Sequence, residues 1–171
     1  MDNEPIQTYD EHGRRLSVAP RGRVHTDGLW HKAANVLLFR SNGQMILQQR
    51  AADKDVCPDL WDLSVAEHLA PGESFEDAAL RGLVEELGLS GIDLVPVSDV
   101  VKARYDQADI CDREFQQSFK GVSDAALRPD PTEVAGIREV TPDELRTAIR
   151  DQPNLFTPWL RDTLKSLNYL I

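Results

Sequence analysis

The sequence predicts a mixed α/β fold of the α+β kind, and three observations support this prediction. The dipeptide Asn42-Gly43 separates two apolar runs, which is the strongest short hairpin signal in the chain. A capped amphipathic helix is predicted from about residue 75 to residue 88. Further strand-like segments follow this helix, and two more helices are predicted near the C-terminus. Strands and helices interleaved in this way indicate helices packed on a sheet.

The central helix is predicted to begin after Ser74, an N-cap residue with Asp77 three positions later, and to end at Gly88. Its apolar residues recur at helical spacing and are expected to form one buried stripe: Leu80, Leu83, Val84 and Leu87. A rotation of about 100° per residue places Glu85 and Glu86 on the opposite face. Carboxylates are the ligands that hard cations such as Mg²⁺ prefer, so this face is either a metal-phosphate site or an ordinary solvated surface.

Two hairpins and a short strand are predicted before this helix. Residues 5–10 and 14–18 form the first hairpin, and residues 33–40 and 44–50 form the second. The connection over residues 19–31 is rich in turn residues and basic, so we expect either a solvated loop or a lip that contacts phosphate or metal. Residues 61–66 predict a short strand that leads into the loop before the helix.

Three strands and then two helices are predicted after the central helix. Residues 92–103 and 114–122 predict two longer strands joined by a polar connection over residues 104–109. Alternation at period 2 places Asp112 and Glu114 on one face, which is either solvent or a metal site. A short strand is predicted at 136–140, followed by a helix capped by Thr141 and a last helix capped by Thr157 that runs to about Tyr169.

Composition narrows the possible partners. The 171 residues carry 19 Lys and Arg against 29 Asp and Glu, a formal net charge of -10. This balance argues against nucleic acid and anionic membranes as partners, and it implies that an anionic substrate is bound through metal. The chain has two cysteines, no long apolar run and no apolar segment near its start. We therefore expect a cytoplasmic protein with reduced thiols, and no obligate protein partner is evident.

The segment from Glu67 to Leu89 resembles the signature of the Nudix hydrolases, G-x5-E-x7-R-E-U-x-E-E-x-G-U, where U is aliphatic. Two positions depart from it, because Glu67 stands in place of the first glycine and Gly82 in place of the glutamate after the arginine. The residues that match are Glu73, Arg81, Leu83, Glu85, Glu86, Gly88 and Leu89. The resemblance implies a single domain over residues 1–171, with an α/β/α sandwich around a mixed sheet and a signature loop and helix at 67–89.

Within this superfamily the chain looks most similar to the subgroup related to isopentenyl-diphosphate isomerase, over about residues 22 to 160. The resemblance implies metal ligands at His31 and His68, further acidic metal-site residues at Asp112 and Glu114, and diphosphate ligands at Arg50 and Lys54. His25 lies one residue out of register with the subgroup. The catalytic cysteine of the isomerases is Ala66 here, which argues against isomerisation because a methyl group exchanges no proton.

The resemblance implies a Mg²⁺- or Mn²⁺-dependent hydrolase that cleaves the phosphoanhydride of nucleoside 5′-di- and triphosphates or other nucleoside diphosphate derivatives. Glu85, Glu86, Glu67 and Glu114 are the expected metal ligands, and the first three are also the expected catalytic residues. Arg50, Lys54 and His68 are expected to bind substrate, while Glu73 and Arg81 brace the loop against the helix. The alternatives are a diphosphate-binding module without turnover and, less favoured, an isomerase-like enzyme.

The two departures from the signature suggest one exchange. If the loop crosses the middle of the helix, Glu67 can reach over the missing side chain of Gly82 and place its oxygens between Glu85 and Glu86. There it would ligate metal or accept a proton from the attacking water. The alternative is that Glu67 faces solvent and that another carboxylate, such as Glu114 or Glu133, is the base.

Overall fold

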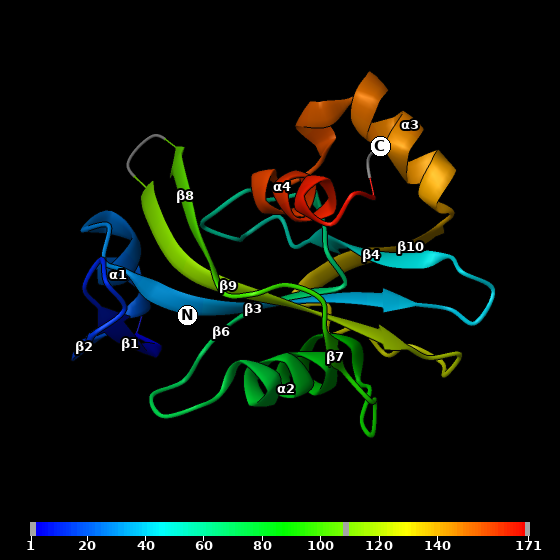
Figure 1. Ribbon diagram of the computed structural model, residues 1–171. Helices are drawn as coiled ribbons and strands as arrows, with labels where there is room; N and C mark the ends of the chain where they lie inside the picture. The colour runs from blue at the N-terminus through cyan, green and yellow to red at the C-terminus, as the bar shows by residue number, and fades with distance from the viewer. Residues whose placement is uncertain (1–2, 108–109, 170–171) are drawn as a thin grey trace.

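A mixed eight-stranded sheet lies between helices on both of its faces, which confirms the predicted sandwich (Figure 1). The structure is a computed structural model and describes residues 3–107 and 110–169. The path through the sheet is β10-β4-β3-β9-β7, and the remaining strands pair at its sides: β5 with β4, β6 with β3, and β8 with β9. Within the described residues, β3 and β9 pair in parallel and the other strand pairs of this sheet are antiparallel. The strands are β3 (His31–Phe39), β4 (Met45–Arg50), β5 (Trp61–Asp62), β6 (Val65–His68), β7 (Val95–Pro96), β8 (Val101–Gln107), β9 (Ile110–Val122) and β10 (Val134–Val140).

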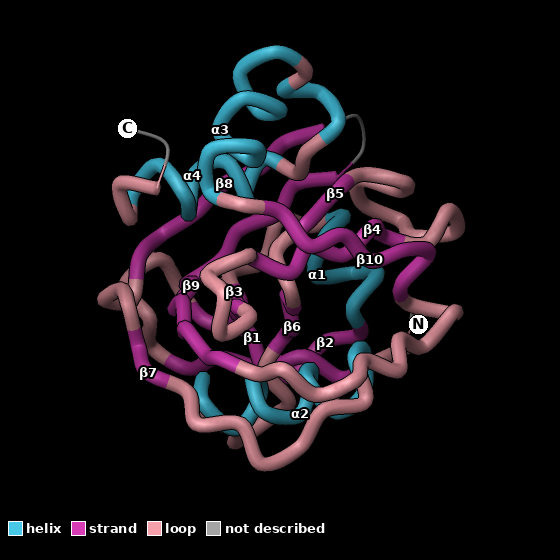
Figure 2. The backbone as a smooth tube through the Cα atoms, turned by 90° about the vertical axis from the view of Figure 1, so that its right-hand side faces the viewer, coloured by secondary structure: helices cyan, strands magenta, loops and turns pink. Residues whose placement is uncertain are grey.

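Each face of the sheet buries its own apolar core. Helix α2 (Phe75–Leu87) covers one face, where Leu83 and Leu87 pack against Val36 and Phe119. Helices α3 (Pro142–Asp151) and α4 (Pro158–Ser166), joined through a short 3-10 turn at Pro153–Leu155, lie on the other face. Figure 2 shows the sheet between these two helical layers. Successive residues of one strand therefore point toward different helices.

The predicted N-terminal hairpin is confirmed as β1 (Pro5–Tyr9) paired antiparallel with β2 (Arg15–Pro20). The segment that follows contains the short helix α1 (Arg21–Thr26), where the sequence predicted only a loop. This helix lies beside one end of the main sheet, close to β9 (Figure 1). It carries His25 with only 3% of its surface exposed.

The hairpin predicted around Asn42-Gly43 is confirmed, but its two strands soon diverge. Gly43 adopts φ +86°, the left-handed conformation that favours glycine. Strands β3 and β4 pair only at Phe39 and Met45. Beyond that point β3 pairs with β6 and β4 pairs with β5. The prediction of one strand over 61–66 was therefore wrong, and the two short strands hold β3 and β4 apart.

The segment after α2 also differs from the prediction of one long strand at 92–103. Pro96 has no backbone N–H to donate, and β7 ends there after two residues. The next strand, β8, runs from Val101 to Gln107 and includes residues that were expected to form a polar connection. The part of that connection at residues 108 and 109 lies outside the described residues.

Helix α2 begins and ends as predicted, but its buried face is different. The Ser74 hydroxyl accepts a hydrogen bond from the Asp77 N–H at 3.1 Å, and Gly88 ends the helix at φ +66°. Val84, expected in the apolar stripe, is 50% exposed, whereas Glu86 is buried at 6%. Small residues, among them Gly82, occupy the middle of the buried face and let the helix lie close to β6.

Candidate active site

A cavity of about 370 Å³ opens where β3 and β4 diverge. Residues from both faces of the sheet line it, because β6 borders the gap and its successive side chains point to opposite faces. His68 therefore reaches the cavity from one face and Glu67 from the other. The cavity brings together two groups of ionisable side chains, one around three histidines and one on α2.

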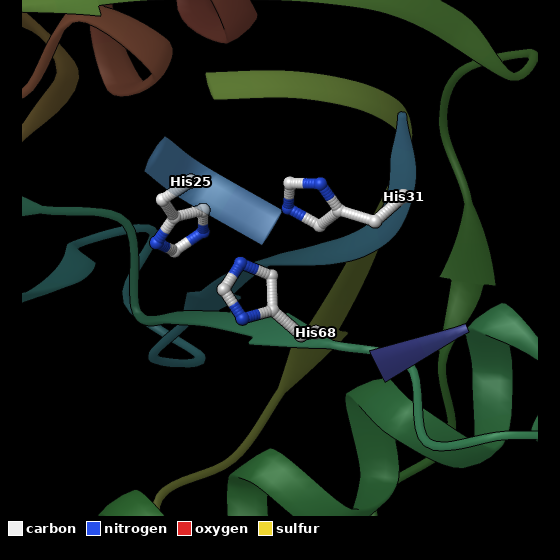
Figure 3. A group of neighbouring side chains, drawn as sticks. All are labelled: His25, His31 and His68. Atoms are coloured by element: carbon white, nitrogen blue, oxygen red, sulfur yellow. The ribbon is translucent and has the colours of Figure 1, made fainter. Parts of the chain in front are cut away.

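Three imidazole rings from separate elements converge on one face of β6. His25 comes from α1, His31 from the start of β3 and His68 from the end of β6 (Figure 3). Their ring centroids are 4.8 to 5.4 Å apart. Strand β9 pairs in parallel with β3 and aligns Glu114 with His31, so the alternating residues Asp112 and Glu114 complete the group. We call these five residues the histidine cluster.

The carboxylates set the protonation of the histidine cluster. Glu114 Oε1 lies 3.4 Å from Nε2 of both His31 and His68. Burial alone raises the pKa of Glu114, but its interactions with the two imidazoles outweigh burial and lower it. Burial by itself lowers the pKa of His31, yet its interaction with Glu114, together with the charge of Asp112, raises the pKa overall. Burial lowers the pKa of His68 to about 3, so its imidazole is neutral near pH 7.

The donor atoms of the histidine cluster fit a divalent transition metal. The possible ligand atoms of the three histidines lie within 4.8 Å of one another, as do those of His31, Asp112 and Glu114. Among the described residues, His31 Nε2 and Asp112 Oδ1 are buried without a hydrogen-bond partner. Unpaired buried polar atoms are costly unless something binds them. Three imidazoles with two carboxylates suit Mn²⁺, Fe²⁺ or Zn²⁺ better than Mg²⁺, which prefers oxygen ligands alone.

The second group of acidic residues lies on the face covered by α2. A Cβ atom built on Gly82 would lie 3.2 Å from Glu67 Cβ, so the Glu67 side chain starts directly above the glycine. Glu86 is buried, and its Oε2 accepts a hydrogen bond of 2.6 Å from Gln48 Nε2. Glu85 is more open to solvent and accepts a hydrogen bond of 3.0 Å from Arg81. All three glutamates line the cavity, and we call them the helix carboxylates.

Burial and mutual repulsion make Glu67 and Glu86 hard to ionise together. Burial raises the pKa of Glu67 to about 7, although the nearby Arg81 guanidinium opposes the shift. Burial, with the charge of Glu67, raises the pKa of Glu86 well above its usual range. A divalent cation would offset this repulsion. Oxygen-only ligands of this kind suit Mg²⁺ or Mn²⁺.

Arg81 ties the signature loop to the helix and to β6. Its Nε and Nη2 donate to the two carboxylate oxygens of Glu73, each at 2.9 Å, and Nη2 also donates to the His68 carbonyl at 2.8 Å. Glu73 in turn accepts from the Ala70 N–H at 2.8 Å. The hydrogen bonds of Glu73 to Arg81 lower its pKa. Both residues thus occupy the bracing position that the signature implied.

Arg50 and Lys54, two of the cations that line the cavity, are each paired with an acid. Arg50 Nη1 donates at 3.1 Å to Asp62 Oδ2, and Asp62 is fully buried. Trp159 Nε1 and Thr157 Oγ1 also donate to Asp62 Oδ1, at 2.6 and 2.9 Å. Lys54 forms an ion pair with Glu133. Arg50 is therefore a structural cation as well as a cavity residue.

The comparisons with known proteins agree with this architecture. Residues 29–160 match the family described as NUDIX domain. The chain belongs to the Nudix family. It is 39% identical over 166 residues to a Nocardia farcinica protein named isopentenyl-diphosphate Delta-isomerase, covering 94% of this chain and 93% of the relative. A Burkholderia multivorans protein of the same name is 34% identical over 157 residues, covering 91% and 88%.

The fold of this Nudix protein is also found in a solved structure. The crystal structure of DR0079 from Deinococcus radiodurans has a TM-score of 0.78 and 22% identity, covering 96% of this chain and 99% of that one. In the described part of the chain, none of the helices is long and apolar enough to span a bilayer.

Most of the predicted site residues of this Nudix protein line the cavity, but Glu73 and His31 are not among its lining residues. The predicted carboxylate ligands lie in two groups rather than one. Glu114, expected beside Glu85 and Glu86, lies with the histidines on the other face of the sheet. Glu133, the other carboxylate considered as a base, also lines the cavity. The sequence placed His25 in the basic connection but did not single it out as a ligand, since its short helix shows no apolar periodicity. It also did not identify the cavity residues Asn35, Gln48 and Trp159 as site residues.

Four aromatic residues that could stack on a base, Trp30, Trp61, Tyr105 and Phe156, are not among the residues that line the cavity. Trp30 packs against Phe115, with ring centroids 5.0 Å apart. Phe156 is buried in the core beneath α4, and Arg138 lies 4.6 Å from the ring of Trp61. Tyr105 packs edge-on against Trp159.

Proposed function

We propose that this Nudix protein is a divalent-metal-dependent hydrolase that cleaves the phosphoanhydride bond of nucleoside 5′-di- or triphosphates or of related nucleoside diphosphate derivatives. One observation carries the proposal: Glu67 of β6 is seated over Gly82, so that a strand carboxylate reaches the cavity where the signature normally has a helix glutamate. Both departures from the signature are explained by this exchange. The cavity thus keeps its number of carboxylates.

The helix carboxylates and the histidine cluster would have different roles in this reaction. Glu85, Glu86 and Glu67 would hold Mg²⁺ or Mn²⁺, which binds phosphate oxygens and offsets the charge that develops during cleavage. Glu114 belongs to the histidine cluster, which would hold a second, softer cation. Arg50 and Lys54 face the cavity and favour binding of the diphosphate.

Glu67 is the residue best placed to accept a proton from the attacking water. Its carboxyl group is buried beside Arg81, with Arg81 Nη1 3.3 Å from Glu67 Oε2, and it lines the cavity. Arg81 holds this carboxylate toward the helix and keeps it from turning to solvent.

Isomerisation is the second candidate, because the relatives that are 39% and 34% identical are named as isomerases. The position of the isomerase cysteine is occupied by Ala66, which lines the cavity. Cys57 and Cys111 are the two cysteines of the chain, and neither is among the residues that line this cavity. Hydrolysis therefore uses side chains that the cavity contains, whereas isomerisation requires another proton donor. A binding module without turnover is the third alternative.

The test is a comparison of two assays on the same preparation. We expect release of phosphate or pyrophosphate from a nucleotide panel with Mg²⁺ or Mn²⁺, and no conversion of isopentenyl diphosphate to its allylic isomer. Glu67→Gln should lower kcat by roughly 10² to 10⁴-fold while the protein stays folded. Glu76→Gln is the matched control, since Glu76 is exposed on α2 and is not among the cavity residues.

Three results would contradict the proposal. Isomerisation without phosphate release would favour the isomerase, and ligand-induced thermal stabilisation without turnover would favour the binding module. Turnover that stays near wild type in Glu67→Gln at saturating Mg²⁺ would assign the base to Glu114 or Glu133.

A further inference from the structure

The orientation of His31 shows how the protein can present an imidazole to the centre of the histidine cluster. Its Nδ1 lies 3.0 Å from the Leu29 carbonyl oxygen, which accepts hydrogen bonds and cannot donate them. The neutral ring therefore carries its proton on Nδ1 and its lone pair on Nε2. In the described part of the chain this Nε2 is buried without a hydrogen-bond partner. The contact at Nδ1 thus selects the tautomer that binds a cation through Nε2.

His25 has a similar arrangement, with a side chain in place of the carbonyl. Its Nδ1 lies 3.5 Å from Oδ2 of Asp55, and a carboxylate likewise only accepts. Figure 3 shows a ring nitrogen of His25 directed toward the other two imidazoles. Because Nδ1 lies beside Asp55, this nitrogen is Nε2.

The ring of His25 is buried without sufficient hydrogen bonding. Only 3% of the residue is exposed, and within the described residues neither ring nitrogen has a hydrogen-bond partner. The contact of 3.5 Å with Asp55 is slightly longer than a hydrogen bond, so a small shift of either side chain would complete it. Buried polar atoms without partners are costly. A cation at Nε2, together with Asp55 at Nδ1, would satisfy the whole ring.

Contacts of its other oxygen hold Asp55 in place. Asp55 lies in the loop between β4 and β5, and its Oδ1 accepts from Arg21 Nη2 and from the Val56 N–H, each at 3.0 Å. Arg21 and His25 are one turn apart on α1, so one carboxylate contacts both. Asp55 is not among the residues that line the cavity, so it can act on the site only through a neighbour.

An ordinary ion pair is the simpler explanation of these contacts. The side chain of Asp55 is 37% exposed, and ion pairs of exposed groups contribute little to stability. The pair with Arg21, however, uses Oδ1 and leaves Oδ2 beside the buried ring of His25. A surface ion pair does not account for this second contact.

We propose that Asp55 is a positioning residue of the histidine cluster, which accepts a hydrogen bond from His25 Nδ1 and so directs His25 Nε2 at the bound cation. This inference rests on the second cation of the proposed function and assigns a role to a residue outside the cavity. A partner of this kind fixes the ring and makes the nitrogen on its other side a better ligand. Its loss weakens metal binding roughly 10- to 100-fold.

The test measures Co²⁺ binding to protein that has been freed of metal with a chelator. Excess Mg²⁺ is present to keep Co²⁺ from the helix carboxylates, and the visible spectrum of Co²⁺ reports its nitrogen ligands. We expect Asp55→Ala to weaken Co²⁺ binding roughly 10- to 100-fold and to change the spectrum of the bound ion. Asp55→Asn should recover part of the affinity, because its amide oxygen still accepts from Nδ1 of His25.

Asp53→Ala is the matched control. Asp53 is an exposed acid in the same loop and is not among the cavity residues, so its loss removes the same charge and should leave Co²⁺ binding unchanged. Thermal unfolding checks that each variant is folded. If Asp55→Ala does not fold, the comparison of Asp55→Asn with Asp53→Asn decides.

Two further variants separate positioning from a structural role. Arg21→Gln breaks the ion pair but leaves Asp55 beside His25, so it should weaken Co²⁺ binding less than Asp55→Ala does. In a protein that already carries His25→Ala, adding Asp55→Ala should have little further effect, because the residue through which Asp55 acts is gone.

Four results would overturn the inference: unchanged Co²⁺ affinity in Asp55→Ala, an equal loss in Arg21→Gln, full additivity of Asp55→Ala with His25→Ala, and a wild-type protein that binds no Co²⁺. The equal loss would assign the effect to the docking of α1. The proposed function fails separately. Co²⁺ binding that depends on Asp55 without nucleotide hydrolysis refutes the hydrolase alone, and hydrolysis with Co²⁺ binding that is independent of Asp55 refutes this inference alone.

Discussion

Replacing Gly82 by alanine tests how helix α2 and β6 fit together. An added Cβ would lie 2.5 Å from Val65 Cγ1, much closer than van der Waals contact, and 3.2 Å from Glu67 Cβ. Val65 is fully buried on β6, and its branched side chain has restricted rotation. The neighbours of the new methyl group must therefore move.

Two opposing contributions set the size of the effect. Alanine in a helix is more favourable than glycine by about 0.5 to 1 kcal/mol. Overpacking a buried contact costs about 1 to 3 kcal/mol. We expect Gly82→Ala to lower the free energy of unfolding by about 1 kcal/mol, which lowers Tm by roughly 2 to 4 °C in a chain of this size. Because Glu67 moves with Val65, kcat should also fall.

The assay is urea unfolding together with steady-state turnover. Val65→Ala removes the overlapping methyl group, so the double variant with Gly82→Ala should be more stable than the sum of the two single effects predicts. Val84→Ala, on the exposed side of the same helix, should change stability by less than about 0.5 kcal/mol. If Gly82→Ala stabilises the protein by the full helix propensity and leaves kcat unchanged, the close approach of α2 and β6 is wrong. The same overlap predicts that Gly82→Glu will not restore the usual signature, even combined with Glu67→Gly.

Three further predictions follow from the site. Glu86→Gln should lower kcat by roughly 100-fold or more, which corresponds to about 3 kcal/mol, and the more exposed Glu85→Gln should lower kcat less. Removal of the metal with EDTA should abolish activity, and undiminished turnover in EDTA would contradict the metal assignment. Arg50→Ala should raise KM and should also lower the free energy of unfolding by about 3 to 5 kcal/mol, because Asp62 is left buried without its cation. A urea unfolding curve that matches wild type would show that the buried ion pair of Arg50 and Asp62 does not stabilise the fold. The pKa of Glu73 is lowered in the folded state, so its contribution is present above about pH 4.5 and is lost as pH falls through the lowered pKa. Glu73→Gln should therefore lower the free energy of unfolding by about 1 kcal/mol at pH 7, a value already reduced for solvent screening, and should leave it unchanged near pH 2. An equal loss of stability at both pH values would show that the charge of Glu73 is not involved.

The elements that the sequence predicted well are those determined by local contacts. The caps at Ser74, Thr141 and Thr157 each need only residues three positions away, and all three form the expected hydrogen bonds. The turn at Gly43 likewise depends on a dipeptide. Local chemistry of this kind can be read without knowledge of the rest of the fold.

The errors arise where distant segments decide the outcome. The helical periodicity of apolar residues predicted that Val84 is buried and Glu86 is exposed on helix α2. In the structure, the buried face of α2 is the one that β6 can approach closely, and Gly82 permits that approach. The polar Glu86 is buried there because Gln48, far away in sequence, supplies a hydrogen bond.

The candidate site shows the same limit. The spacing of the signature located Glu85 and Glu86, and alternation placed Asp112 and Glu114 on one face, as the structure confirms. The parallel pairing of β3 with β9 is a long-range feature, and it alone brings Glu114 to the histidines. His25 required knowledge of how α1 docks, which no local pattern in its sequence reveals.

The register of β6 determines the chemistry on both sides of the cavity. Glu67 and His68 are neighbours in sequence, so they point to opposite faces, one toward the helix carboxylates and the other into the histidine cluster. A slip of one residue would exchange them and place an imidazole over Gly82. Val65 prevents this slip, because its methyl group fits against Gly82 at a distance that any larger residue would forbid. Gly82 therefore has two roles: it vacates the position that Glu67 fills, and it fixes the strand so that each side chain reaches its own group.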